Sequence, residues 1–597
     1  MRKIAKNIIA LSISSALSIS FISSINAATY QLVDTGEDST ARYTYAQQQN
    51  MSGDIAISGS DIYNFPVQYE YFTEADFDSI EIYAAYNHSS IHSLENIEDS
   101  VALRSGSPTA NDLAWVVRWL QDTSSGTGNN IEYQKVGGSI AMAKVDGVTR
   151  SFNLWDTNFE GSQDISRSTV NILTGITNTG ISFGSATAPY LPSETFIDDS
   201  EVEHIYWLRE HGLRGFFSYD NGARVHEITP FETEYGGGIS AVMDVNDAGI
   251  AVGFSSFELV PGYAEFIESD SGGCADPDIV PSTKSLEACI AETQISTTSI
   301  YNSMAFKATL SSSGTAVIDR LGLLVTPHED DERSYSSYAL AVNSSGNAVG
   351  YADGFYDETV TVPAVDESQY YQYAVVYKNG SVIDLSGDHS DKGGSIAYDI
   401  NDAGIAVGHV TNNSGINKFF YVDTNAPLEQ IEMVTPDDFF TGSASSARAI
   451  NNSGFIVGDG EIETHNESTS NPRRTAAFVY DMNNDIFSNL NTAIPCSLRL
   501  TYDIVEARDI NDDGVISATA TIKVERHDAK GEVMLDDNGI PLTEDVLRAI
   551  SLEPIPDTGE VCTAEEEEKV ERRGASISFT ALFSVMALFG LRRRFFR

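Results

Sequence analysis

Residues 245–253 are Val-Asn-Asp-Ala-Gly-Ile-Ala-Val-Gly, and residues 400–408 are Ile-Asn-Asp-Ala-Gly-Ile-Ala-Val-Gly. Asparagine, whose side chain bonds nearby backbone groups, suits the first position of a type I turn, and glycine three residues later suits a left-handed backbone. The apolar residues on both sides are typical of strands. Each stretch therefore predicts a tight β-hairpin with a bulge, and the second copy indicates a repeat.

The same motif recurs along most of the chain. Further copies begin at Val342, Ile450 and Ile510, whereas two weaker ones carry Thr177 in place of asparagine or start at Asn50. The central glycines are Gly53, Gly180, Gly249, Gly346, Gly404, Gly454 and Gly514. After a first gap of 127 residues, these glycines are 50 to 97 residues apart, which leaves room for more strands between copies.

An aromatic strand and a second turn follow most copies. Residues 215–219 precede Asn221, and residues 374–377 precede Asn379, each asparagine being followed by glycine. Similar aromatic strands are residues 304–306, 419–421 and 477–480. Asn-Gly between apolar runs is a strong hairpin signal, and two hairpins make a four-stranded sheet of roughly 50 to 70 residues, the content of one propeller blade.

The repeats predict an all-β fold, a seven-bladed β-propeller, with eight blades as an alternative. The first gap contains Asp146 and Gly147 followed by Phe152, which we interpret as the second hairpin of a degenerate unit within residues 140–155. An open β-solenoid or stacked sandwiches could be built from the same hairpins. Closure into a propeller would remove the strand edges that an open array must protect.

The charge of the chain excludes one class of function. It has 36 basic and 86 acidic residues and a net charge of -50. Binding of DNA or RNA needs basic patches that replace the counterions of the phosphates, so no nucleic-acid partner is expected. The acidity favours solubility in a salty exterior or the binding of divalent cations.

Both ends of the chain have the pattern of targeting segments. Arg2, Lys3 and Lys6 precede an apolar, serine-rich stretch and Ala27, the order of a secretory signal peptide that signal peptidase would cleave after Ala27. An uncut membrane anchor is the alternative. Near the other end, Gly574 precedes an apolar run at 577–591 and an arginine-rich terminus. That run is short for a membrane span of roughly 20 residues, which favours processing over a permanent C-terminal anchor.

The tail resembles a GlyGly-CTERM sorting tail, and the repeats resemble the HAF-type extracellular repeats of secreted bacterial proteins. From about Asn50 to Leu552, and with both end segments, the chain resembles an uncharacterised family of exported Gram-negative proteins. The resemblance implies cleavage near Gly574 by a rhomboid-type intramembrane protease, although Ala575 stands where a second glycine is expected. It implies location and fold, and it brings no biochemical role.

These segments define the expected domain organisation. The predicted parts are a signal peptide at 1–27, a propeller-like repeat domain at 28–555, an acidic linker at 556–573 and a sorting or transmembrane tail at 574–597. The expected insertions lie at about 81–135, 262–300 and 526–545.

The four cysteines agree with export, because disulfides persist outside the cytoplasm. Four cysteines allow three connectivities, of which we favour Cys274 with Cys289 and Cys496 with Cys562. The first bridge would contribute about 3 kcal/mol in the chain-entropy account. A CxxC motif, which would indicate a redox or zinc-thiolate site, is absent from the sequence.

Residues 111–121 predict a short amphipathic helix within the first insertion. Trp115 and Trp119 are four residues apart and share one face. We expect them to pack this helix onto the sheet body, and a platform for a sugar or peptide is the alternative.

No catalytic residue is predicted. His88 and His92 are four apart, but no glutamate between them could act as a base, and nucleophile-elbow, P-loop and dinucleotide motifs are absent from the sequence. Calcium is the one cofactor candidate. Asp509, Asn511 and Asp513 place oxygen side chains at alternate positions before a glycine, as calcium loops do. The alternative is a plain turn, since the twelfth position of the loop is Ala520.

Three functions stay open on this basis. The first is an exported scaffold of the cell envelope, outer surface or medium that binds an extracellular glycan or protein and touches the membrane through its tail. The second is a secreted hydrolase or lyase that acts on glycans through paired carboxylates. The third is an envelope structural or assembly factor. Fold alone does not choose among them.

Overall fold

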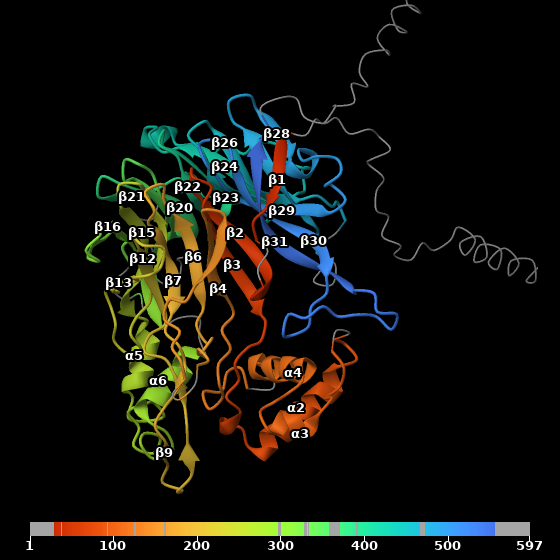
Figure 1. The fold of residues 1–597 in the computed structure, drawn as a ribbon. Coiled ribbons are helices and arrows are strands. Elements are labelled where there is room, and N and C mark those ends of the chain that lie inside the picture. The colour runs from red at the N-terminus through yellow and green to blue at the C-terminus, as the bar shows by residue number, and fades with distance from the viewer. Residues whose placement is uncertain are drawn as a thin grey trace, which may run out of the picture. The chain divides into compact units, whose positions relative to one another are not determined.

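The computed structural model describes residues 29–555, apart from 37–38, 92–93, 125–126, 160, 162, 296–299, 328–330, 332, 357–369, 388, 390–391 and 466–471. These residues form a seven-bladed β-propeller, which confirms the predicted all-β fold (Figure 1). The predicted signal peptide, acidic linker and sorting tail, with Ala27, Cys562 and Gly574, lie outside the described residues.

Each blade is an antiparallel sheet whose first strand in the chain lies at one edge. Blades 1 and 2 are β2 (Ala41–Gln49), β3 (Ile55–Ile62), β4 (Ile140–Val145) and β5 (Val148–Phe152), then β6 (Asn171–Ile176), β7 (Ser182–Thr187), β12 (Leu213–Ser218) and β13 (His226–Ile228). Blades 3 and 4 are β14 (Ser240–Val245), β15 (Ile250–Leu259), β16 (Tyr301–Leu310) and β17 (Ala316–Arg320), then β18 (Ser337–Val342), β19 (Ala348–Phe355), β20 (Tyr370–Lys378) and β21 (Ser381–Asp384). Blades 5 and 6 are β22 (Lys392–Ile400), β23 (Ile405–Asn412) and β24 (Asn417–Asp423), then β25 (Ser445–Ile450), β26 (Phe455–Glu461), β27 (Thr475–Asp481) and β28 (Ile486–Asn489).

Blade 7 joins the two ends of the described chain. It consists of β29 (Tyr502–Ile510), β30 (Ile516–Glu525), β31 (Thr543–Pro554) and, as its outer strand, β1 (Tyr30–Asp34). Tyr30 pairs with Pro554, and Asp34 with Ile550. The N-terminal strand thus completes the last blade, which closes the ring and covers an edge that would otherwise be exposed.

The seven repeat motifs are the hairpins between the first and second strands of the seven blades. Their central glycines have φ between 74° and 84°, the left-handed conformation that the motif predicts. Residues 140–155 form the predicted second hairpin, but its assignment to a separate degenerate unit is wrong. Strands β4 and β5 pair with β3 and complete blade 1, because an insertion separates the two hairpins of that blade.

A hydroxyl group six residues before the motif asparagine joins neighbouring blades at five of the seven motif copies. Ser240, Ser337, Ser395 and Ser445 each accept the backbone N–H of a residue in the third strand of the preceding blade, at 2.8 to 3.1 Å. Thr44 accepts the N–H of Ala549 in the same way between blades 7 and 1. Apolar side chains fill the remaining space between blades; Val252 of blade 3, for example, packs with Ala339 and Val375 of blade 4.

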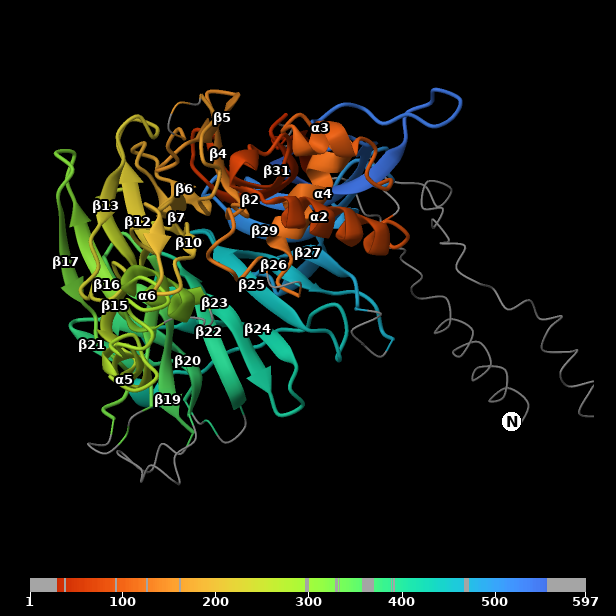
Figure 2. The same ribbon diagram turned by 90° about the horizontal axis from the view of Figure 1, so that it is seen from below.

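The long insertions leave the propeller on one face. Segments 63–139, 188–212, 260–300 and 526–542 all connect the second strand of a blade to its third, so they lie on the face opposite the motif hairpins, and Figure 2 looks onto them. Their elements are η1 (Tyr69–Tyr71), α2 (Glu74–Asn87), α3 (Ser100–Arg104), α4 (Ala110–Gln121), β8 (Leu191–Pro192), β9 (Phe196–Ile197), β10 (Glu203–His204), β11 (Trp207–Leu208), α5 (Pro261–Glu268) and α6 (Leu286–Ile295). We call this side the insertion face and the other the motif face.

The predicted helix exists as α4, but its tryptophans do not pack it onto the sheets. Trp119 lies in a core with Phe77 and Ile80 of α2 and Leu103 of α3, and the ring of Trp115 contacts Tyr83 of α2. The insertion therefore has its own helical core, and the chain has more helix than the one short segment expected. In the described part of the chain, no helix combines the length and apolarity needed to cross a membrane.

Cysteine pairing agrees with the prediction where it can be described. Cys274 and Cys289 form a disulfide with a Cα–Cα distance of 5.8 Å, within the insertion of blade 3. Cys496 is also disulfide-bonded, and its predicted partner Cys562 lies outside the described residues.

Candidate functional site

The motif face opens into a cavity of about 580 Å³ in the centre of the propeller. All seven blades contribute their first strand and motif turn to its wall, through residues 47–51, 174, 176–178, 243–247, 340–344, 396, 398–402, 448–452 and 508–512. The repeats therefore build the cavity, and its chemistry depends on how each copy differs from the others.

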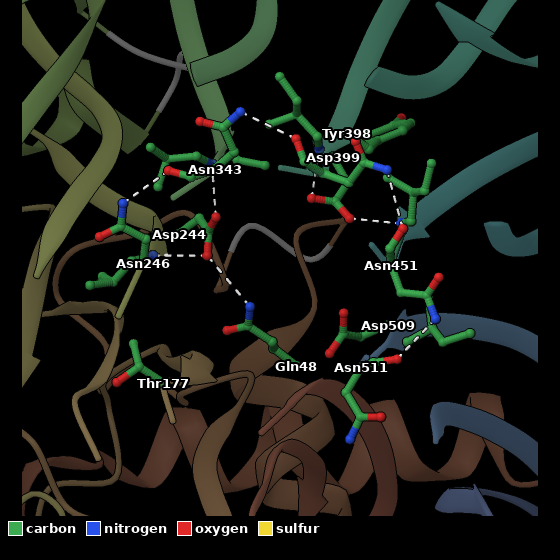
Figure 3. A pocket seen from close by; sticks show the side chains of 18 of the residues that line it. Gln48, Thr177, Asp244, Asn246, Asn343, Tyr398, Asp399, Asn451, Asp509 and Asn511 are labelled. Atoms are coloured by element: carbon green, nitrogen blue, oxygen red, sulfur yellow. Dashed lines mark hydrogen bonds between the residues drawn. The ribbon is translucent and has the colours of Figure 1, made fainter. Parts of the chain in front are cut away.

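The motif asparagines form a ring around the mouth of the cavity. The Oδ1 of each caps its own turn; that of Asn246, for example, accepts the N–H groups of Ala248 and Ile250. The Nδ2 group donates to the backbone carbonyl of the same motif position in the next blade. The chain of these bonds runs from Asn246 to Asn343, Asn401, Asn451, Asn511, Asn50 and Thr177, at 2.9 to 3.3 Å (Figure 3). Thr177 has no amide, so its side chain cannot continue the ring to Asn246.

Three carboxyl groups lie just inside this asparagine ring. Asp244, Asp399 and Asp509 stand two residues before the asparagine in blades 3, 5 and 7, and they point into the cavity in Figure 3. The strand register shifts at each of them, which is the bulge that turns the side chain inward.

Each carboxyl group holds two blades together. Asp244 accepts the N–H of Val245 in its own blade and of Val342 in the next, both at 2.8 Å. Asp399 does the same with Ile400 and Ile450, at 2.7 and 2.8 Å. Asp509 accepts the N–H of Ile510 and, at 2.8 Å, that of Gln49.

This pairing explains why only alternate copies of the motif carry an aspartate. Three carboxyl groups serve blades 3 and 4, 5 and 6, and 7 and 1, so the intervening blades can have Ala341, Ala449 and Gln48 at the same position. Because the number of blades is odd, blade 2 shares no aspartate with a neighbour, and it has Gly175 at this position. The alternation is visible in the sequence, but its reason depends on which blades are neighbours in the closed ring.

The carboxyl groups do not titrate like exposed ones. Burial raises the pKa of Asp244 and of Asp509 to about 7, and that of Asp399 to about 6. The negative charge of Asp399 adds to the rise at both of the others. Between about pH 6 and 7 these three groups are therefore partly protonated, and a cation placed between them would favour their ionised form.

The rest of the wall differs from one side to the other. Met243 and Leu340 line it in blades 3 and 4, whereas Tyr398, Arg448 and Arg508 line it in blades 5 to 7. Arg448 lies over the ring of Tyr398 at 5.1 Å and donates from Nε to Asp459 at 2.8 Å. The cavity can thus hold a small polar ligand, with the carboxyl groups facing a positively charged part of it.

The structure gives separate roles to the residues of the calcium hypothesis. Asp509 faces the cavity, Asn511 Oδ1 accepts the N–H of Asp513 and Val515, and Asp513 is exposed. Within the described ranges, no group of three or more His, Cys, Asp or Glu side chains is arranged to hold a metal ion. Calcium stays a prediction. His88 follows α2 at the protein surface, and His92 lies outside the described residues.

Comparison with known proteins adds a family and a fold. Residues 5–594 match the profile of a family described as "Protein of unknown function (DUF3466)". A comparison with curated proteins found no match.

Similar solved structures include a sialidase of Trypanosoma rangeli in complex with the inhibitor DANA, at 11% identity and a TM-score of 0.28, covering 68% of this chain and 56% of that one. A puromycin-hydrolyzing peptidase of Mycobacterium tuberculosis is 9% identical with a TM-score of 0.33, covering 90% and 57%. An ancestral GH74 enzyme is 10% identical with a TM-score of 0.27, covering 72% and 63%. The chain thus spans less than two thirds of the length of each of these proteins.

Proposed function

We propose that this chain, which belongs to the DUF3466 family of proteins of unknown function, is an exported scaffold of the cell envelope or surface. In this proposal its central cavity binds a small cationic ligand. The basic, apolar and small-residue order of residues 1–27 supports export. The disulfide between Cys274 and Cys289 supports it too, since such bonds persist outside the cytoplasm.

One observation carries the binding role: three carboxyl groups from different blades point into one cavity, burial raises the pKa of all three, and the charge of Asp399 adds to the rise at Asp244 and Asp509. A ligand with an ammonium group, or a metal cation, would offset that negative charge. Because the ionised carboxyl groups attract it most, binding would release protons and strengthen as the pH rises through about 6 to 7.

The insertion face supports a second part of the proposal, the binding of a glycan or protein partner. Four insertions gather there, and loops on a rigid propeller are where binding residues concentrate. A glycan or protein partner would meet the insertion face, while the cavity opens on the motif face.

Calorimetric titration of the full chain with butylamine, 1,4-diaminobutane and calcium chloride tests the cavity. We expect an amine or calcium to bind, and Asp399→Asn to weaken binding about tenfold or more. Asp353→Asn is the matched control, since Asp353 is also a partly buried carboxyl with a raised pKa that accepts a backbone N–H, from Ser336 at 2.7 Å, but it does not line the cavity. Equal effects of the two variants, or binding that does not change between pH 5.5 and 8, would overturn the proposal.

The same carboxyl groups support a second candidate, a glycan-active hydrolase. A general acid at neutral pH needs a pKa near 7, as Asp244 and Asp509 have. Release of nitrophenol from a panel of nitrophenyl glycosides tests this candidate. Activity lost in Asp244→Asn and kept in Asp353→Asn would support it, and no turnover of any member by the native chain would oppose it.

A further inference from the structure

The disulfide-bonded insertion of blade 3 contains a second pocket, separate from the central cavity. Its volume is about 570 Å³, within the range of roughly 300 to 1,000 Å³ that small-molecule sites occupy. Tyr263 and Phe266 of α5, Ile279 and the disulfide-bonded Cys289 of α6 form apolar parts of its wall. Phe266 is 42% exposed, so an aromatic ring at the pocket remains open to a ligand.

Gly262 lines this pocket, although its backbone conformation does not require glycine. It is the second residue of α5, where glycine is a poor helix former, and its φ is not positive. A Cβ built on Gly262 would meet no atom within 4 Å. The other glycines of the wall are required, since Gly272 has a φ of +81° and a Cβ on Gly273 would lie 2.0 Å from the carbonyl oxygen of Phe266.

The charged groups of the wall are one lysine and one glutamate. Lys284 Nζ donates to Glu292 at 2.5 Å, and the two side chains are 27% and 44% exposed. An ammonium has three donors, and Lys284 uses one of them on the described residues, so it can bind a second anion. A cation beside an apolar pocket matches a molecule with an apolar chain and an anionic end.

We propose that this pocket binds a single-chain carboxylic amphiphile, with the acyl chain along Tyr263 and Phe266 and the carboxylate on Lys284. The acyl chain removes the apolar wall from water, which provides most of the binding free energy. The carboxylate competes with Glu292 for Lys284. The inference does not depend on the role of the central cavity.

Titration of the full chain with dodecanoate below its micelle concentration tests the proposal. We expect Gly262→Leu to fill the pocket and weaken binding at least tenfold, without a lower melting temperature, because the new side chain begins in open space. Gly138→Leu is the matched control, since a Cβ there also meets no atom and Gly138 lies outside the pocket. Dodecanoate that fails to bind the native chain, or binds both leucine variants equally, would overturn the proposal.

Two further variants test the headgroup. Lys284→Gln should weaken dodecanoate about fivefold or more and leave dodecanol unchanged, because only the acid needs the ammonium. Glu292→Gln should tighten dodecanoate, since it removes the competing carboxylate. An unchanged affinity for dodecanoate in Lys284→Gln would refute the assigned headgroup. Asp399→Asn, which tests the central cavity, should leave dodecanoate binding intact.

Discussion

The side chain of Gln48 in blade 1 reaches past blade 2 to Asp244 in blade 3, where Nε2 lies 3.5 Å from Oδ1. Space for this contact exists because blade 2 has Gly175 at the position that carries aspartate in alternate blades. A Cβ on Gly175 would lie 1.9 Å from Gln48 Oε1. The odd blade is thus bridged by a side chain from its neighbour.

Substitution of Gly175 should therefore destabilise the propeller. Gly175→Val would force Gln48 away from Asp244, and overpacking of this kind costs about 1 to 3 kcal/mol. Urea denaturation measures the change in the free energy of unfolding. Gly138→Val serves as the control because its added side chain meets open space. Equal stability of the two variants would show that Gln48 can leave its place freely.

The raised pKa values predict that the propeller loses stability as the pH increases. In the folded chain the carboxyl groups of Asp244 and Asp509, with pKa of about 7, bind protons more tightly than they do unfolded, where the ordinary value is 3.8. The folded state therefore holds more protons between these values, and the free energy of unfolding falls as the pH rises from about 4 to about 7.

Asp244→Asn isolates this effect. It should make the fall smaller, because the carboxyl group of Asp244 no longer titrates. Asp353→Asn cannot serve as the control here, since its pKa is also raised, to about 6. Asp512→Asn, at an exposed motif position, is the control. Denaturant curves at several pH values measure the slope, and a slope that is unchanged in Asp244→Asn would contradict the prediction.

The features that could be predicted from the sequence are those that depend on residues close together in the chain. An asparagine and a glycine three positions apart specify a turn locally, so all seven hairpins, including the weak one at Thr177, were predicted. The pairing of Tyr30 with Pro554 was missed, because β1 has no local signal that identifies so distant a partner. Helix α2 was missed although Thr73 and Asp76 form a capping box, since its apolar residues do not follow one clear stripe.

The site was predicted in part. Asp509 was named, but as a calcium ligand, and its use as an acceptor for two blades depends on the order of blades around the ring. The order of the blades is a property of the closed propeller and is not encoded by any local motif. The apolar pocket of the blade 3 insertion has no motif at all, because it depends on how α5 and α6 are held by the disulfide.

Processing at both ends is a prediction that the described residues leave untested. We expect the native protein isolated from its own cells to lack residues 1–27 and those after about Gly574, as shown by intact mass, and to be found at the surface or in the medium. A mass that includes Phe596 and Arg597, in the inner-membrane fraction, would contradict the sorting-tail interpretation and favour a tail-anchored envelope protein.

The interrupted asparagine ring gives a reciprocal pair of variants. Thr177 already caps its turn, because its hydroxyl accepts the N–H of Ile181 at 3.0 Å, but it lacks the side-chain amide that the asparagines donate to the next blade. Thr177→Asn should add that bond and stabilise the fold by about 0.5 to 1.5 kcal/mol, the net value of one hydrogen bond. Asn343→Thr should lose its bond to the carbonyl of Asn401 and destabilise the fold by a similar amount. Denaturant titration of both variants measures the two changes. Opposite signs would establish the ring as a stabilising element, whereas destabilisation by both would mean that the threonine in blade 2 fits its own turn better than an asparagine can.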